Sequence, residues 1–98
     1  MNAINCYTCP ECGGRTVTID VDDGTTPFLL RCKATPGCEG MAESGLYRPP
    51  PDCGPPQWEW YKPGPEETRR LPRPMREHVQ QGGLLLRAHQ AARNFTNT

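Results

Sequence analysis

Strict alternation of apolar and polar side chains marks residues 15–21 as a strand that is buried on one face. Val17, Ile19 and Val21 share one face of this strand, and polar residues occupy the other. Residues 27–32 form a second, mostly apolar segment, and the Asp-Gly pair between the two segments is typical of a tight turn. The pattern therefore predicts that the two segments pair as a β-hairpin.

The second half of the chain alternates short predicted elements with prolines. Residues 49–56 are expected to form an extended, semi-rigid spacer, because most of them are proline. Short helices are predicted over 65–71 and 74–81, since proline opens each and a Gly-Gly pair follows the second. Residues 84–87 are predicted to form a strand that pairs with 58–61.

Two further segments have less regular patterns. The latter part of residues 41–48 is predicted to form a third short strand, with Leu46 or Tyr47 packing on the hairpin. Residues 88–94 are predicted to form a frayed helical turn, and residues 95–98 a tail.

Two cysteine pairs flank the predicted hairpin, and each pair lies in a turn rich in proline and glycine. Two residues separate Cys9 from Cys12, with Pro10 between them and a Gly-Gly pair after them. Five residues separate Cys32 from Cys38, again with a Pro-Gly turn between them. Such pairs are typical of a four-cysteine site that holds one Zn²⁺. Because four thiolates leave no position for a substrate, the predicted role of the zinc is structural.

The remaining cysteines, Cys6 and Cys53, leave alternatives open. Cys6 lies two residues before Cys9, so Cys6/Cys9 competes with Cys9/Cys12 as a ligand pair. The turn residues favour Cys9/Cys12, because only that pair encloses a proline and precedes two glycines. Buried thiols or a disulfide framework are alternatives to a metal, and iron is an alternative to zinc. Cys6 and Cys53 are interpreted as free thiols, as a second cysteine pair, or as ligands that take the place of one of the four.

Composition limits the size of the core. The chain has 98 residues, of which 35% are hydrophobic, and domains this small usually need a metal, disulfides or a partner for stability. The N-terminal residues lack the basic and apolar regions of a secretory signal, and no apolar run reaches the roughly 20 residues of a membrane span. The expected location is therefore a reducing compartment such as the cytoplasm.

Charge is balanced overall but divided between the two halves of the chain. Residues 1–49 carry four basic and six acidic side chains, and residues 50–98 carry seven basic and five acidic ones. A zinc ion with four thiolates adds two further negative charges to the first half, which disfavours phosphate binding there. The candidate phosphate contacts are therefore Arg69, Arg70, Arg73 and Arg76. Glutamates lie among these arginines, so a solvated helix face is the alternative interpretation.

Three aromatic residues follow the proline-rich segment: Trp58, Trp60 and Tyr61. Tryptophan and tyrosine are frequent anchors at protein interfaces, so these residues are candidates for partner binding. A small satellite core over the hairpin and base stacking are the alternatives. His78 and His89 are the only histidines, and no phosphate-binding or dinucleotide motif is present, so no enzyme is predicted.

Residues 9–40 resemble the zinc-ribbon superfamily through CPECGG, the C-x5-C-E-G segment and the hairpin between them. The resemblance implies a knuckle–β-hairpin–knuckle fold, in which each knuckle is a cysteine turn, and structural zinc bound by Cys9, Cys12, Cys32 and Cys38. The remaining motifs, WEWYKP, PMREHV and GGLLLR, look similar to small zinc-ribbon accessory proteins of phages and prophages.

These observations predict a small, metal-stapled, β-rich protein. A zinc ribbon over residues 1–48 precedes a Pro-rich, aromatic extension over residues 49–98, which packs on the ribbon or on a partner. The expected function is a non-catalytic protein-interaction module of phage type, either a virion component or an inhibitor of a host factor. It would be cytoplasmic or virion-associated. The alternative is a nucleic-acid-binding regulator that uses the arginines with Trp58 and Trp60.

Overall fold

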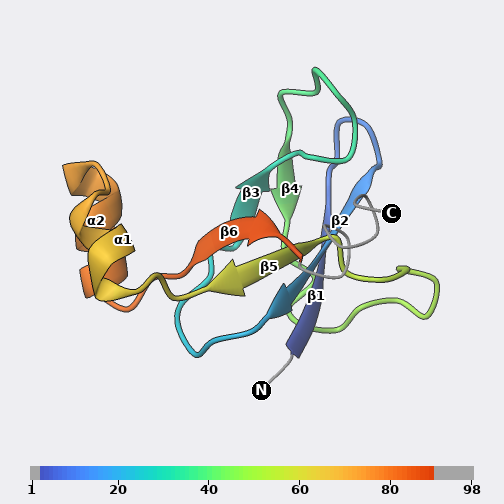
Figure 1. Ribbon diagram of the computed structural model, residues 1–98. Helices are drawn as coiled ribbons and strands as arrows, with labels where there is room; N and C mark the ends of the chain where they lie inside the picture. The colour runs from blue at the N-terminus through green and yellow to red at the C-terminus, as the bar shows by residue number, and fades with distance from the viewer. Residues whose placement is uncertain (1–2, 90–98) are drawn as a thin grey trace, which may run out of the picture.

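A computed structural model describes residues 3–89, in which six strands form one sheet and two helices lie beside it (Figure 1). The elements in chain order are β1 (Ala3–Thr8), β2 (Arg15–Asp20), β3 (Leu29–Arg31), β4 (Met41–Glu43), β5 (Trp58–Tyr61), α1 (Pro65–Arg69), α2 (Arg73–Gln80) and β6 (Leu85–Ala88). The strand order is β3-β4-β1-β2-β5-β6, so the described chain is β-rich, as predicted.

The predicted hairpin between residues 15 and 32 is wrong. β2 pairs antiparallel with β1, and β3 pairs antiparallel with β4, while β2 and β3 are not neighbours in the sheet. Each cysteine pair therefore lies at the tip of its own hairpin, rather than at the two ends of one shared hairpin. The long β2–β3 connection crosses the sheet instead, and Pro27 O in it accepts a hydrogen bond of 2.6 Å from Tyr7 Oη.

The strands from the predicted extension continue the same sheet. β5 pairs in parallel with β2, with Thr18 opposite Trp58 and Asp20 opposite Trp60. β6 pairs antiparallel with β5, which confirms the predicted pairing of the two segments. The sheet thus contains strands from both sides of residue 48.

Both predicted helices are present, and in Figure 1 they lie together at one end of the molecule, away from the sheet. Proline lies in the first turn of each helix, where its missing N–H costs no hydrogen bond. Gly82, with φ of +96°, ends α2. Its N–H donates to Val79 O, and that of Gly83 donates to His78 O, which is a Schellman motif. Within residues 3–89, neither helix has the length and apolar character needed to cross a bilayer.

The third predicted strand lies earlier than expected. β4 takes the first residues of the 41–48 segment, and Leu46 and Tyr47 instead form an exposed turn with φ of 53° and 59°. The predicted packing is therefore wrong for Leu46, whereas Tyr47 contacts the segment predicted as the hairpin through hydrogen bonds of its hydroxyl with Asp20 and Thr26. Ala88 ends β6, and the rest of the predicted helical turn, together with the tail over 95–98, lies outside the described residues.

The core is small, and its main cluster lies on the face of the sheet that carries Tyr7, opposite the predicted face of Val17, Ile19 and Val21. On that predicted face Val17 is buried against Cys6, so β2 is covered on both sides. The most buried large side chains of the main cluster include Tyr7, Trp60 and Leu84, and the ring centroids of Tyr7 and Trp60 lie 6.5 Å apart. Cys9 and Cys32 belong to the same buried cluster. The core therefore ends at the cysteine turns, which makes their mutual attachment important for the whole sheet.

Candidate metal centre

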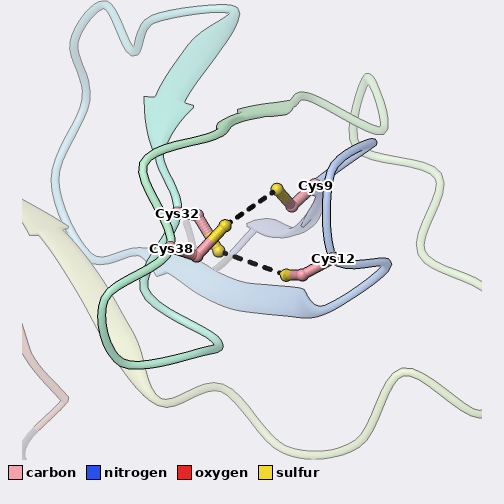
Figure 2. Close-up of side chains that lie close together, drawn as sticks. All are labelled: Cys9, Cys12, Cys32 and Cys38. Carbon is pink, nitrogen blue, oxygen red and sulfur yellow. Dashed lines mark hydrogen bonds between the residues drawn. The ribbon is translucent and has the colours of Figure 1, made fainter.

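Four cysteines converge from the two hairpin tips (Figure 2). The sulfur atoms of Cys9, Cys12, Cys32 and Cys38 all lie within 4.8 Å of one another. Two of these separations, Cys9 Sγ to Cys38 Sγ and Cys12 Sγ to Cys32 Sγ, are 3.7 Å. A tetrahedron built on metal–sulfur bonds of about 2.3 Å has an edge of about 3.8 Å. The four thiols can therefore hold one metal ion.

The first cysteine turn is shaped by its glycines. Gly13 has φ of +73°, a conformation that glycine adopts without strain, and its N–H donates to Cys9 O at 2.8 Å. The turn closes through a bond from Cys9 N to Gly14 O, and Gly14 N in turn points at Cys12 Sγ at 3.4 Å. The Gly-Gly pair thus places an amide donor beside the second sulfur.

The second turn reaches the same arrangement despite its longer spacing. Gly40 N lies 3.4 Å from Cys38 Sγ, as Gly14 N does from Cys12 Sγ. The additional residues fold into a tight turn in which Cys38 N donates to Thr35 O, and Gly37 has φ of +82°. The C-x5-C spacing is therefore compatible with a site that also uses C-x2-C.

Hydrogen bonds favour the metal-binding form of Cys12. The hydroxyl of Thr35 donates to Cys12 Sγ at 3.3 Å, and with the Gly14 amide it lowers the pKa of this thiol to about 6. Thr35 belongs to the opposite cysteine turn, so the bond also joins the two hairpin tips. Sequence reasoning missed Thr35, because nothing in the spacing shows which residue faces the first turn.

Mutual repulsion limits how many of the four thiols can ionise without a cation. The Gly40 amide lowers the pKa of Cys38, but burial and the neighbouring sulfurs of Cys9, Cys12 and Cys32 raise it to about 12 overall. Four thiolates at these distances need a positive ion among them. The site lies at the edge of the core, since Cys9 and Cys32 are buried whereas Cys12 is exposed.

The two other cysteines lie outside the cluster. Cys6 is in β1, opposite Val17 of β2, and is buried, which raises the pKa of its thiol. Cys53 lies in the loop after β4, where its Sγ donates to Gly54 O. All six cysteines are free thiols. The structure thus groups Cys9 with Cys12 rather than with Cys6, as the turn residues indicated.

The predicted aromatic anchors are mostly unavailable at the surface. Trp60 and Tyr61 are only 4% and 9% exposed, and Trp60 belongs to the core. Trp58 is half-buried, with Lys33 Nζ 5.0 Å from its ring centroid. For Trp60 the structure agrees with the alternative of a small core, because β5 is an interior strand of the sheet.

The predicted arginine contacts lie on and between α1 and α2. Arg69 Nη2 is 3.4 Å from Glu66, and Arg73 Nε is 2.9 Å from Glu77, so these two arginines have carboxylate partners within their helices. Among residues 3–89, Arg70 and Arg76 have no ion pair. The four arginines therefore differ in whether a carboxylate lies near them, and the exposed pair of Arg69 with Glu66 is a weak one.

The sequence analysis did not predict that one carboxylate is buried. Glu59, between the two tryptophans of β5, is 3% exposed. Arg87 Nε lies 2.6 Å from one carboxylate oxygen and His89 Nδ1 lies 2.8 Å from the other. Arg87 faces Glu59 across the β5–β6 pairing, so the only available signal was the register of two strands that are distant in sequence.

The sequence matches no protein-family model, no curated protein and no solved structure. The resemblance to zinc ribbons and to phage accessory proteins therefore rests on sequence motifs alone. The established description is coarser: a small β-rich protein with two short helices, whose four clustered cysteines could hold one metal ion.

Proposed function

We propose that the four-cysteine cluster binds one Zn²⁺ per chain as a structural ion. An all-thiolate donor set is soft, and such sets with roughly tetrahedral geometry select zinc or iron. Four protein ligands leave no coordination position for water or substrate, which favours a structural over a catalytic ion. The main support for this proposal is that two sulfur–sulfur distances are 3.7 Å, which is close to the edge length of a zinc–thiolate tetrahedron.

Native mass spectrometry of the reduced protein, before and after chelation, tests this proposal. One zinc per chain is expected for the parent protein and for Cys53→Ser, whereas Cys12→Ser and Cys32→Ser should lose most of the zinc. A coloured protein with one iron per chain would show that the bound ion is iron rather than zinc. Zn²⁺ is a d¹⁰ ion and gives no redox chemistry or colour of its own. Metal-free, oxidised protein would refute a metal centre altogether.

We further propose that the protein is a non-catalytic protein-interaction module. Among residues 3–89, six large apolar side chains are exposed, and five of them come from one stretch of the chain: Phe28, Leu29, Met41, Leu46 and Tyr47. Exposed apolar side chains that gather on one surface are typical of docking sites. This stretch, which we name the β3–β4 surface, replaces Trp60 and Tyr61 as the candidate for partner binding.

The backbone places two of these residues side by side and the others close to them in the chain. Arg31 pairs with Met41 and Leu29 with Glu43, so Leu29 and Met41 are diagonal neighbours on the outward face of the hairpin. Ser44 N donates to Phe28 O, which holds the turn containing Leu46 beside the start of β3. β3 is also an edge strand of the sheet, with its outer backbone groups available for pairing.

The proposed partner is another protein, and the phage-type resemblance suggests a virion structural protein or a host factor. A photo-crosslinking amino acid at Met41 should capture this partner in native cells, whereas one at Met75 should not. The two methionines are similarly exposed, 45% and 42%, but lie on different parts of the molecule. Met41→Ser should weaken the complex and Met75→Ser should not. Equal loss from both variants would refute a β3–β4 docking surface.

Nucleic-acid binding is the second candidate, favoured by Arg70 and Arg76, which have no ion pair in the described part of the chain. Salt dependence distinguishes the two candidates. Affinity for nucleic acid should fall steeply between about 50 and 200 mM salt, by about tenfold or more when several phosphates are neutralised. An apolar docking surface should lose little affinity over the same range, so salt-insensitive binding supports the protein-interaction proposal.

A further inference from the structure

A cavity of about 810 Å³, widely open to solvent, lies between α1, α2 and the turn that precedes α1. Lys62, Arg69 and Arg76 line it, together with Asp22 from the β2–β3 connection. Pro63 and Val79, which are both buried, contribute apolar wall. None of the four clustered cysteines lines this cavity, so it is a separate site.

The charges around the cavity are not balanced. Three cationic side chains face one carboxylate, which leaves a formal charge of +2 on the lining. Arg69 has only an exposed pair with Glu66, both side chains being 72% accessible, and such pairs are weak. In the described part of the chain, Lys62 and Arg76 have no ion pair. The cavity therefore holds positive charge that a bound anion would neutralise.

Hydrogen bonds fix the cavity walls relative to the sheet. Asp22 Oδ2 accepts from Lys62 N at 2.9 Å, which attaches the β2–β3 connection to the turn before α1. Thr25 exchanges bonds with Gly82 O and Leu84 N, so the same connection also holds the chain that leaves α2. Arg76 Nη1 lies 3.4 Å from Leu71 O, which orients the guanidinium and leaves its other N–H groups available.

We propose that this cavity binds a small molecule carrying a phosphate group. Arginine and lysine are the side chains that bind phosphate most readily, and three of them line one concave site. The volume lies within the range of about 300–1,000 Å³ typical of small-molecule sites. The apolar walls at Pro63 and Val79 contact the remainder of the ligand, while the cations bind its phosphate.

Titration with adenosine 5′-monophosphate, followed by amide NMR shifts at about 50 mM salt, tests the proposal. Adenosine serves as the phosphate-free control, and inorganic phosphate tests the anion alone. Shifts are expected at residues 62–68 and 76–80. Lys62→Gln and Arg76→Gln should each weaken binding about tenfold, as expected when one charge-assisted hydrogen bond is lost. Arg70→Gln removes the same charge outside the cavity and should change affinity less than about twofold.

A variant that is expected to increase the affinity, rather than decrease it, provides a second test. Asp22→Asn keeps an oxygen acceptor for Lys62 N but removes the only carboxylate in the lining, so binding should tighten. Weakening by Arg70→Gln as large as by Arg76→Gln would overturn the cavity site. Tighter binding of oligodeoxythymidylate, with equal contributions from all the helix arginines, would also overturn it and indicate a nucleic-acid surface. These outcomes leave the zinc and β3–β4 proposals untouched, because neither uses cavity residues.

Discussion

At the scale of single residues, Gly40 limits how closely the two cysteine turns approach. A Cβ at this position would lie 2.7 Å from both Cys9 Sγ and Glu11 Cγ. Gly40→Ala must therefore displace a proposed ligand sulfur, and zinc affinity should fall about tenfold or more, as for other changes that misplace metal ligands. Competition with a chromophoric chelator measures this affinity.

Gly54 supplies the matched control for this prediction. It has φ of +82°, but no atom would lie within 4 Å of an added Cβ. Gly54→Ala should cost about 1 kcal/mol of stability through left-handed strain and leave zinc affinity unchanged. Parental zinc affinity in Gly40→Ala would show that the steric explanation is wrong.

The cluster itself could be predicted residue by residue, because the turn chemistry around each cysteine is local. Prolines and glycines beside Cys9, Cys12 and Cys38 were visible in the sequence, and they selected the cysteines that the structure brings together. The hydrogen bond from Thr35 to Cys12 was not predictable. It depends on two hairpin tips meeting, and the sequence contains no local signal for that contact.

At the scale of elements, the two tryptophans of β5 share one face of the strand but differ in environment because of their position along it. Trp60 packs in the core beside Tyr7, whereas Trp58 is half-buried near Lys33 at the surface. Trp60→Ala should destabilise the metal-loaded protein by about 3–5 kcal/mol, as for large-to-small changes in a core. Trp58→Ala should cost about 1 kcal/mol, mainly a cation–π contact and partial burial. Denaturant titration monitored by circular dichroism measures both.

Trp60→Phe keeps this prediction testable if the alanine variant does not fold. Phenylalanine retains most of the buried ring area and loses an indole N–H that has no hydrogen-bond partner within the described structure. Its cost should therefore be clearly smaller than that of Trp60→Ala. Equal costs for alanine at positions 58 and 60 would contradict the environments described for β5.

Elements with local signals were predicted well, and strand pairing was not. The helices have proline starts and a glycine stop, so α1 and α2 were found nearly at their observed bounds. The pairing of β2 was wrong, because alternation does not identify a strand's neighbour. Its predicted core face was wrong as well, since Thr16 and Thr18 are 1% and 0% exposed and lie on the side of Tyr7, whereas Ile19 and Val21 are only half-buried.

β1 was missed, since its buried Asn5 looks like a surface residue. Asn5 is satisfied by the amide of the next residue, Cys6, and by Ser44 and the Tyr47 amide, which only the fold brings close.

At the scale of the whole molecule, the sheet has two parts with unequal attachment. β1, β2, β5 and β6 form a continuous four-stranded sheet with extensive pairing. The β3–β4 hairpin joins that sheet through one paired position, Thr8 opposite Glu43. Its other principal connections are the cysteine cluster and the small core, so a bound metal would supply much of its attachment.

Removing the metal should therefore affect the two parts differently. Amide hydrogen exchange of the zinc-loaded protein, with and without chelator under reducing conditions, measures the effect. Amides of β3 and β4 should lose protection first and by the larger factor, because two of the four ligands lie in the loop between these strands. Amides of β1 and β2 should retain more protection, since their ladder extends over six residue pairs. Uniform loss across all six strands would indicate one cooperative unit and contradict this division.

The same experiment bears on the β3–β4 surface, whose apolar side chains would lose their arrangement when the hairpin is released. Partner binding should therefore depend on the metal.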